Sequence, residues 1–206
     1  MIKIAENTIK RLIVYKKELN RLKAEGKKFI YSHVLAALSG SQPHLVRRDL
    51  MAVGYSGSPA HGYSVKELES SISDFLCSSR QVKVILIGIG NLGRAIIDYC
   101  HKQNPKIAIS SAFDIDPNKI NKEYHGVYCF HIDTARNYVI ENEIKVAIIT
   151  VPDSEAQTIA TALSDAGIRG ILNFTPGRLR VPENVYVENA DMMLYLEKVI
   201  YFVQNV

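Results

Sequence analysis

Hydrophobic residues recur at two different spacings in this chain of 206 residues, and the spacing changes near residue 81. In the first eighty residues the apolar positions are three or four apart, which is typical of helices with one buried face. Beyond residue 81, short apolar runs such as VKVILI and KVAIIT alternate with helical patterns. This alternation predicts a doubly wound parallel sheet, so the expected fold is α/β with a helical N-terminal domain.

The N-terminal pattern predicts three helices. The first can end at Gly26, and its apolar stripe consists of Ile9, Leu12, Tyr15, Leu19 and Leu22. Ser32 is the expected N-cap of a second helix, VLAAL. Ser41 is the expected N-cap of a third helix, QPHLVRRDLMAV, which tolerates Pro43 in its first turn. The residues of this helix that are expected to face inward are Leu45, Leu50 and Val53.

The second and third helices have the spacing of a helix-turn-helix. About three residues join them. The third helix carries Arg47 and Arg48, which suits a helix in the major groove, where arginine can bond guanine edges. The next loop, YSGSPAHGY, can form the wing of a winged helix, and the capping box SVKE at residues 64–67 opens a further helix. An ordinary helical bundle is the alternative. The residues expected to contact DNA are Ser32, Gln42, His44, Arg47, Arg48, Ser58 and His61.

Positive charge is concentrated in this N-terminal part. Residues 1–80 contain 13 Lys and Arg against 7 Asp and Glu, a net charge of +6. Residues 81–206 contain 12 against 14, a net charge of −2. This asymmetry favours a polyanion such as DNA as the partner of the first half, although a solvated basic face would give the same count.

The overall composition is that of an ordinary globular protein, with 47% hydrophobic and 22% charged residues. No run approaches the roughly 18 apolar residues of a membrane helix, and the N-terminus has no apolar signal core, so we expect a cytoplasmic protein without membrane contact. Cys77, Cys100 and Cys129 share no metal-binding spacing. They are expected to be small buried hydrophobic residues and to bind no metal; a redox-sensing thiol is the alternative.

A glycine run directly follows the strand VKVILI. In Gly88-x-Gly90-x-x-Gly93 the first glycine permits a tight turn, the second lets the backbone approach a pyrophosphate, and the third lets the helix pack on the strand. The next strand, IAISSAF, ends in Asp114, whose carboxylate can accept hydrogen bonds from ribose hydroxyls. No arginine follows in the next three residues, so NAD(H) is favoured over NADP(H). An isolated loop aspartate is the alternative.

Other cofactor contacts are expected where further strands end, because ligands bind beyond the carboxyl ends of parallel strands. Arg94 either assists with the phosphates or is a plain surface arginine. The residues expected to bind the cofactor are Gly88, Ile89, Gly90, Asn91, Leu92, Gly93, Asp114, Val151, Pro152, Asn173 and Phe174.

No catalytic residue is predicted beside this site. None of the histidines follows a predicted sheet strand in a suitable position, and the Tyr-x-x-x-Lys spacing of short-chain reductases is absent. The residues after Phe174 are too few to enclose a substrate. We therefore expect a cofactor that is sensed by a protein that is not an enzyme. Two alternatives are a small NAD-dependent oxidoreductase and a regulator of another adenine ligand such as coenzyme A, whose 3′-phosphate Asp114 would repel.

The last predicted helix, DMMLYLEKVIYFVQN, is apolar nearly all round and must be buried on all sides. Insertion into a partner subunit would bury it; packing within its own domain is the alternative. A twofold dimer also suits a helix-turn-helix, because two recognition helices one turn apart read a palindrome. The expected dimer contacts are Tyr99, Asp191, Met192, Tyr195, Val199 and Phe202.

The chain resembles the Rex family of redox-sensing transcriptional repressors. The resemblance spans nearly the whole sequence and rests on RLIVYKKELNRLKAEGK, LVRRDL, the glycine run with Asp114, VPDSEAQ, AGIRGILNFTP and VENADM. It implies a winged-helix DNA-binding domain at 1–80, a Rossmann NAD(H)-binding domain at 81–188 and a swapped dimerisation helix at 189–206. It also implies a homodimer that binds AT-rich palindromic operators and is released by NADH, with NAD+ competing for the same site. Arg47 and Arg48 match the family's basic recognition pair, and Asp191 matches its interface aspartate.

The sequence departs from the family in the wing and around the recognition helix. The family's basic wing is replaced by Ser58, Pro59, Ala60 and His61, so operator affinity and its salt dependence should be smaller. After Arg48-Asp49-Leu50 the family's Ser-Tyr-Phe-Gly is replaced by Met51-Ala52-Val53-Gly54, and the short helix before the turn lacks the usual glutamate.

Overall fold

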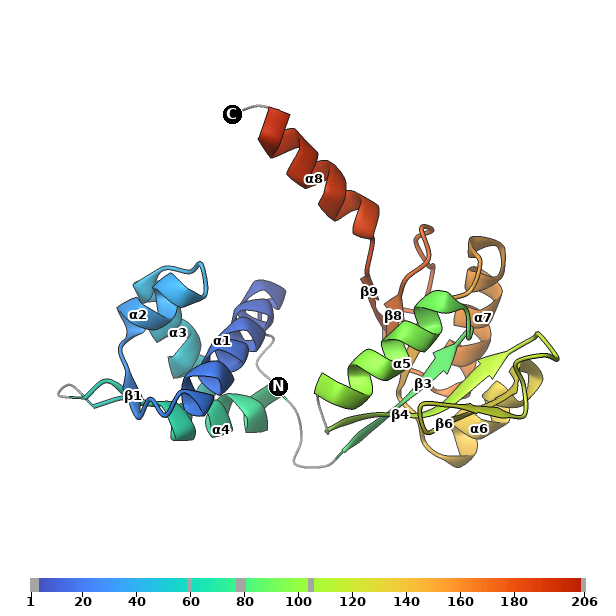
Figure 1. Ribbon diagram of the computed structural model, residues 1–206, viewed down its shortest axis with the longest axis horizontal. Helices are drawn as coiled ribbons and strands as arrows, with labels where there is room; N and C mark the ends of the chain where they lie inside the picture. Colours follow the sequence, from blue (N-terminus) through green and yellow to red (C-terminus); the bar gives the residue numbers. More distant parts are fainter. Residues whose placement is uncertain (1–3, 59–60, 77–80, 104–105, 205–206) are drawn as a thin grey trace. The chain divides into compact units, whose positions relative to one another are not determined.

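The computed structural model describes residues 4–58, 61–76, 81–103 and 106–204. These residues belong to two compact units, 1–80 and 81–206 (Figure 1). The expectations for Pro59, Ala60 and Cys77 lie outside the described residues.

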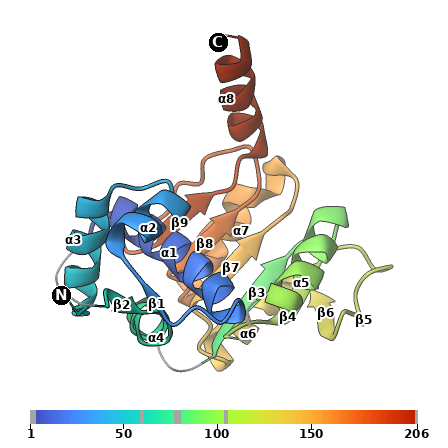
Figure 2. The same cartoon turned by 60° about the vertical axis from the view of Figure 1, so that its left-hand side comes forward.

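The first unit is a small helical domain with a short β-ribbon (Figure 2). Its buried centre is built mainly from the apolar faces of four helices, and α1 packs along α4 while α2 packs against α3. Strand β1 pairs antiparallel with β2. The elements are α1 (Glu6–Ala24), β1 (Phe29–Ile30), α2 (Ser32–Leu38), α3 (Pro43–Val53), β2 (Tyr63–Ser64) and α4 (Val65–Leu76).

The predicted helices are confirmed, but both serine caps are displaced by one residue. Tyr31 is the N-cap of α2 and Gln42 is the N-cap of α3, and neither side chain caps its helix. Ser32 is therefore the first helical residue, not the cap. The Ser41 hydroxyl lies 3.1 Å from the Tyr15 hydroxyl, so it bonds a neighbouring helix instead of the α3 backbone. Pro43, with its fixed φ, occupies the first position of α3.

The buried face of α3 also differs from the expectation. Val46 is completely buried, whereas Leu45 and Val53 are only half-buried. Residues four apart share a helix face, so Val46 and Leu50 form the inward stripe and Leu45 lies beside it. In α1, Thr8 is buried and Ile9, which was expected on the stripe, is half-buried.

The predicted wing lies between α3 and α4, and its residues up to 58 and from 61 on are described. Ser58 and Gly62 exchange two backbone hydrogen bonds of 2.7 Å. Gly62 has a φ of +74°, and a Cβ there would lie 2.5 Å from the Ile30 carbonyl oxygen, so the loop needs glycine at this point. Half of the predicted capping box is present: the Glu67 N–H donates to Ser64 Oγ at 3.4 Å. The Glu67 carboxylate instead accepts the Tyr55 hydroxyl at 2.9 Å.

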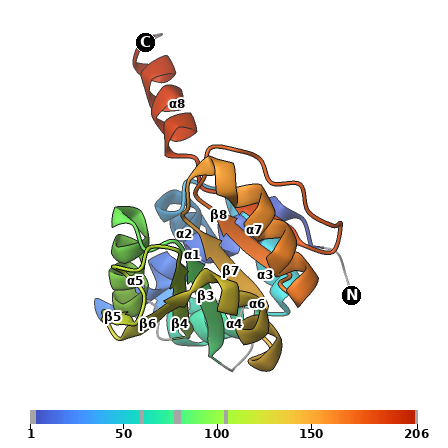
Figure 3. The same ribbon diagram turned by 90° about the vertical axis from the view of Figure 1, so that its right-hand side faces the viewer.

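The second unit is a doubly wound sheet, and Figure 3 shows helices on both of its faces. Among the described residues the strand order is β5-β6-β4-β3-β7-β8-β9, and β5 is the antiparallel member. The strands are β3 (Val82–Ile87), β4 (Ile107–Asp114), β5 (Lys122–Tyr124), β6 (Val127–His131), β7 (Val146–Ile149), β8 (Gly170–Asn173) and β9 (Tyr186–Asn189). The helical elements are α5 (Asn91–Gln103), the 3₁₀ turn η1 (Ile132–Thr134), α6 (Ala135–Glu141) and α7 (Asp153–Ala166).

Alternate residues of the central strands serve the two faces of this sheet. Ile85, Ile87 and Phe113 pack in the cluster that includes α6 and α7. Val84 and Leu86 pack in the cluster that includes α5. The expected Rossmann-like α/β class is thus confirmed. The elements of this unit that were not predicted are β5, β6, β9, η1 and α6, and the boundary expected after residue 188 falls inside β9.

The chain continues from β9 into α8 (Met192–Gln204), drawn in red in Figure 1. Asp191 begins this helix: its Oδ1 accepts the N–H groups of Met193 at 2.9 Å and Leu194 at 3.2 Å. No residue from 192 to 204 is buried, although most of them are apolar. The alternative in which α8 is covered by its own domain is therefore wrong. In the part of the chain that the structure describes, no helix is long and apolar enough to span a bilayer.

Candidate nucleotide-binding site and DNA-binding surface

The glycine run forms the turn between β3 and α5, and each glycine has a different surrounding. Gly88 has a φ of +95°, and a Cβ there would lie 2.9 Å from the Thr150 carbonyl oxygen. A Cβ on Gly93 would overlap the Gly88 carbonyl oxygen, so the third glycine permits close packing of helix on turn. A Cβ on Gly90 would meet no atom within 4 Å. The backbone at Gly90 is therefore open to a ligand.

The N-terminus of α5 directly follows this turn. The first amides of a helix lack partners within the helix, and the aligned peptide dipoles place partial positive charge there. A phosphate beside Gly90 would meet both the amides and this charge. The Arg94 guanidinium lies over the Tyr124 ring, 5.0 Å from its centre. It is therefore engaged with this ring and is not directed at the phosphate position.

Asp114 ends β4 beside the glycine turn and is 7% exposed. Its carboxylate accepts the Ile89 N–H at 2.7 Å and the Asp116 N–H at 2.9 Å, and the Lys119 ammonium lies 3.2 Å away. Burial alone would raise the pKa of Asp114, but these two N–H groups and the ammonium lower it below its ordinary value. The carboxylate is thus ionised at neutral pH and can accept further hydrogen bonds.

A cavity of about 810 Å³ opens over the turn and the carboxyl ends of the neighbouring strands. Five of the predicted cofactor residues line it: Gly88, Gly90, Asp114, Val151 and Pro152. Its volume lies within the usual range of ligand pockets. Sequence reasoning missed Lys119, Ile132 and Glu155, which also line it. Lys119 could have been noticed, because a cation five residues after a site carboxylate is within reach of it.

The other predicted cofactor residues are not part of the lining: Ile89, Asn91, Leu92, Gly93, Asn173 and Phe174. Ile89 is completely buried in the sheet core. Asn173 is also completely buried, and its amide donates to the Gly177 carbonyl oxygen and to Asn189 Oδ1, both at 2.9 Å. Its side chain therefore holds the loop after β8 and does not reach the cavity.

One histidine lies nearer to this region than the sequence suggested. His131 ends β6, which was not predicted, and it pairs in register with Asp114. Its Nδ1 accepts the Asp133 N–H at 3.3 Å, and it is not among the residues that line the cavity. No histidine, tyrosine or cysteine occurs among the described residues of that lining.

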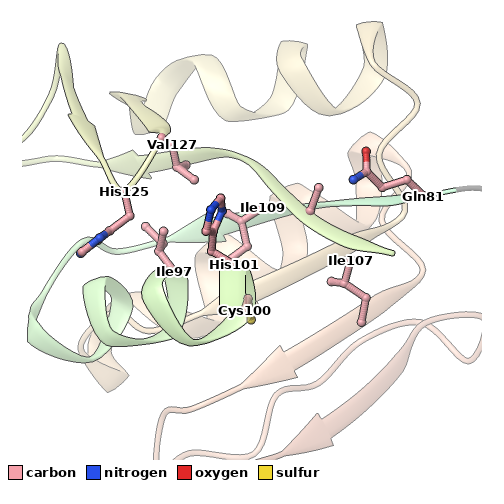
Figure 4. A pocket seen from close by; sticks show the side chains of 10 residues that line it. Gln81, Ile97, Cys100, His101, Ile107, Ile109, His125 and Val127 are labelled. Carbon is pink, nitrogen blue, oxygen red and sulfur yellow. The ribbon is translucent and has the colours of Figure 1, made fainter. Parts of the chain in front are cut away.

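A second, smaller cavity of about 300 Å³ lies at the opposite end of α5. Figure 4 shows Cys100 and His101 from the last turns of α5, with His125 from the turn before β6. A helix C-terminus carries partial negative charge, and the glycine in the described lining, Gly126, lies in the turn between β5 and β6 and not before a helix. It is therefore unsuited to a pyrophosphate, and the larger cavity is the better nucleotide site.

The described cysteines are unreactive in character. Burial raises the pKa of the Cys100 thiol, and burial with the nearby Asp114 charge raises the pKa of Cys129 to about 11. Cys129 is completely buried, as expected for a small hydrophobic residue. Both groups remain thiols near neutral pH, and a thiol is a far weaker nucleophile than a thiolate. The redox-sensing thiol has no support at these two positions. The described residues also hold no cluster of three or more metal-ligating side chains.

The candidate DNA contacts of the first unit lie on the exposed side of α3 and on the wing. Gln42, His44, Arg47 and Arg48 are all exposed, and Arg47 Nη1 donates to Ser32 Oγ at 3.3 Å. Ser58 and His61 of the wing are exposed too, and the His61 ring lies 5.5 Å from the Phe29 ring. His61 of the wing thus lies beside Phe29 of β1, where a basic stretch would be expected from the family resemblance.

Comparison with known proteins decides which family this arrangement belongs to. The chain is 37% identical over 203 residues to the "Redox-sensing transcriptional repressor Rex" of Listeria welshimeri. The aligned residues cover 98% of this chain and 94% of the relative. It is 40% identical over 200 residues to the protein of that name from Geobacillus sp. (strain WCH70), covering 97% and 93%. The chain belongs to the Rex family of redox-sensing transcriptional repressors. Rex proteins are repressors rather than enzymes, in agreement with the expected role.

Solved Rex structures have the same fold as this chain. The Rex-family repressor RSP in complex with β-NAD+ and operator DNA has a TM-score of 0.92 at 30% identity, covering 100% of this chain and 94% of RSP. RSP in complex with β-NADH has a TM-score of 0.89, also at 30% identity, with 100% and 96% coverage. Two family profiles match parts of this Rex chain: "Putative DNA-binding protein N-terminus" at residues 3–50 and "CoA binding domain" at residues 79–177.

Proposed function

We propose that this protein is a redox-responsive repressor that binds operator DNA through residues 1–80 and NAD(H) through residues 81–188. The observation that carries the proposal is a glycine turn and an ionised carboxylate at a cavity without a catalytic histidine, tyrosine or cysteine among its described lining residues. The same chain carries a helix-turn-helix with two exposed arginines. A cofactor site with no histidine, tyrosine or cysteine in its described lining suits sensing better than turnover.

The residues around Asp114 fit NAD(H). The pyrophosphate would lie against Gly90 and the first amides of α5, and the adenosine ribose would hydrogen-bond the Asp114 carboxylate. The nicotinamide end would then lie toward Val151 and Pro152, beyond β7. Lys119 contacts both Asp114 and Asp116, so it must move or share these acceptors when a ribose binds.

The profile match to a coenzyme A domain supports the second candidate, a regulator of another adenine ligand. The charges near the ribose favour NAD(H) instead. Asp114 and Asp116 carry two negative charges and Lys119 one positive charge, so the cluster is net negative. A 3′-phosphate of coenzyme A or a 2′-phosphate of NADP(H) would be repelled there.

The proposed switch is a change of dimer geometry. NADH favours a closed dimer whose two recognition helices no longer match the spacing of an AT-rich palindrome. NADH must bind the closed state better than the open state by the whole coupling free energy, typically about 1–3 kcal/mol. The site of action is the cytoplasm, where promoter DNA and the NADH pool meet.

The apolar surface of α8 supports the dimer. Tyr195 is 60% exposed, Val199 59% and Phe202 58%, and such a surface requires a partner. We propose that Tyr99, Asp191, Met192, Tyr195, Val199 and Phe202 contact the second subunit. Tyr99, at 64% exposed, would extend this surface onto α5.

Removing residues 192–206 is expected to convert the dimer into a monomer. Light scattering should give a mass about twice the chain mass of 23.1 kDa for the full protein and close to the chain mass for the truncated one. An exposed-face control, Lys122→Ala on β5, should leave the dimer mass unchanged. A truncated protein that keeps the dimer mass would contradict the role of α8.

The test of the function is fluorescence anisotropy of a labelled AT-rich palindromic duplex, titrated with protein and then with NADH or NAD+. We expect release at low NADH concentration and far weaker release by NAD+. Tight DNA binding that ignores both nucleotides would refute redox sensing. Absence of binding at low salt would show that the altered wing does not support this operator.

A further inference from the structure

A carboxylate lies buried in the recognition helix, directly after the two exposed arginines. Asp49 of α3 is 1% exposed, whereas its neighbours Arg47 and Arg48 are exposed. A buried charge is costly unless it is paired and hydrogen-bonded. Sequence patterning gave no sign of this burial, because an aspartate on a short helix is usually in solvent.

Arg11 of α1 pairs with this carboxylate through two parallel contacts. Its Nε lies 2.6 Å from Asp49 Oδ2, and its Nη2 lies 2.8 Å from Asp49 Oδ1. The hydrogen bond to Asp49 raises the pKa of Arg11, so the guanidinium keeps its charge. A two-point contact between planar groups fixes orientation as well as distance.

Three further residues complete the network. Tyr15 of α1 donates its hydroxyl to Asp49 Oδ2 at 3.2 Å and lies 3.1 Å from Ser41 Oγ, in the turn between α2 and α3. Thr8 Oγ1 donates to Asp49 Oδ1 at 3.3 Å. The network therefore ties together α1, the turn of the helix-turn-helix and the recognition helix.

The position of Asp49 on α3 links this network to the DNA surface. Successive residues of a helix point about 100° apart around its axis. When Asp49 points into α1, Arg48 and Arg47 are turned by about 100° and 200° away from it, toward solvent. Fixing the direction of Asp49 thus fixes the direction of both arginines. Apolar packing is non-directional, so it would fix this rotation less firmly than a two-point contact between planar groups.

We propose that Asp49 and Arg11 are positioning residues for operator recognition, which set the rotation of α3 about its axis and thereby aim Arg47 and Arg48 at the base edges. This inference rests on the proposed DNA-binding function. It makes the ion pair a determinant of specificity, with a smaller effect on binding to DNA of arbitrary sequence, where phosphate attraction dominates.

The test compares three variants of the full-length protein. Arg11→Lys keeps the charge but loses the two-point geometry. The double variant Arg11→Met with Asp49→Leu replaces the pair by apolar groups. Lys23→Met is the matched control, because it breaks an ion pair between α1 and a different helix, Lys23 with Glu69 of α4, and leaves α3 untouched. The readouts are the ratio of affinities for the palindrome and a scrambled duplex, the thermal midpoint, and the amide NMR shifts of residues 43–53.

We expect the affinity ratio to fall at least tenfold in Arg11→Lys and in the double variant, and to stay unchanged in Lys23→Met. The double variant should retain a thermal midpoint close to that of the parent, so its loss of specificity would not follow from instability. An unchanged ratio in the double variant, or one that falls only as the midpoint falls across the variants, would overturn the positioning role.

The NMR shifts separate this inference from the proposed function. If the parent protein did not prefer the palindrome, the proposed function would fail. The amides of residues 43–53 would still report the orientation of α3 without DNA. We expect them to shift in Arg11→Lys and not in Lys23→Met, and unchanged shifts in Arg11→Lys would overturn the inference by themselves.

Discussion

Replacing Arg47 and Arg48 with alanine is expected to weaken operator binding at least 100-fold while the affinity for NADH stays the same. Each good arginine contact to a base pair contributes about 1–3 kcal/mol of discrimination, and a dimer on a palindrome loses every contact twice. Both side chains are exposed, so their removal should leave the core of the first unit intact.

The measurement is anisotropy with the palindromic duplex at several salt concentrations. Arg21→Ala is the control, because Arg21 is an exposed arginine of the same unit that pairs with Glu18 within α1. Replacing both arginines should also reduce the dependence of operator affinity on salt concentration, to the extent that their side chains contact phosphates. Operator affinity that is unaffected, or reduced equally by Arg21→Ala, would mean that α3 is not the recognition helix.

Asp114→Ala is expected to abolish release of the operator by NADH, with DNA binding retained. Hydrogen bonds to a charged group contribute about 1.5–3 kcal/mol each, so losing two ribose contacts should weaken NADH binding about 100-fold or more. The change also leaves the Ile89 and Asp116 N–H groups without their acceptor, which loosens the glycine turn.

NADH affinity can be followed by the fluorescence of the reduced nicotinamide, and release by anisotropy of the operator. Asp116→Ala is the matched control, since that carboxylate lies 3.7 Å from Lys119 but is more exposed. It should change NADH affinity far less than Asp114→Ala does. An unchanged NADH affinity in Asp114→Ala would contradict the assignment of the ribose contact.

The sequence predicted the class of fold because the two hydrophobic spacings are strong signals. The runs VKVILI at 82–87 and IAISSAF at 107–113 predicted strands, and strands are present at 82–87 and 107–114. Strands β5 and β9 are short, partly polar and lie at the edges of the sheet, so no long apolar run marks them. Strand β6 does carry a short apolar run, VYCF, which was not interpreted as a strand. Edge strands are half in solvent, and their sequences carry little of the core's pattern.

The candidate site was predicted in part, for a related reason. The glycines at fixed spacing and the carboxylate after the second strand are local features of the sequence. They indicate the backbone geometry of the turn directly, so this part of the site could be predicted. The roles of Asn173 and Lys119 depend on long-range contacts, with Asn189 in one case and with a carboxylate across a turn in the other. The burial of Asp49 likewise depends on Arg11, 38 residues away in the chain. Local sequence patterns do not predict pairings between residues so far apart in the chain.

The uncovered surface of α8 has a consequence for how much of this protein a cell must hold. If folding is completed only when two chains meet, stability follows mass action, and the midpoint of unfolding rises with protein concentration. A cell that makes few copies would lose subunits to proteolysis before they pair. Repression would then rise more steeply with the total amount of repressor than operator binding by a preformed dimer would predict. The expression level of the gene would therefore affect the NADH concentration at which the operator is released.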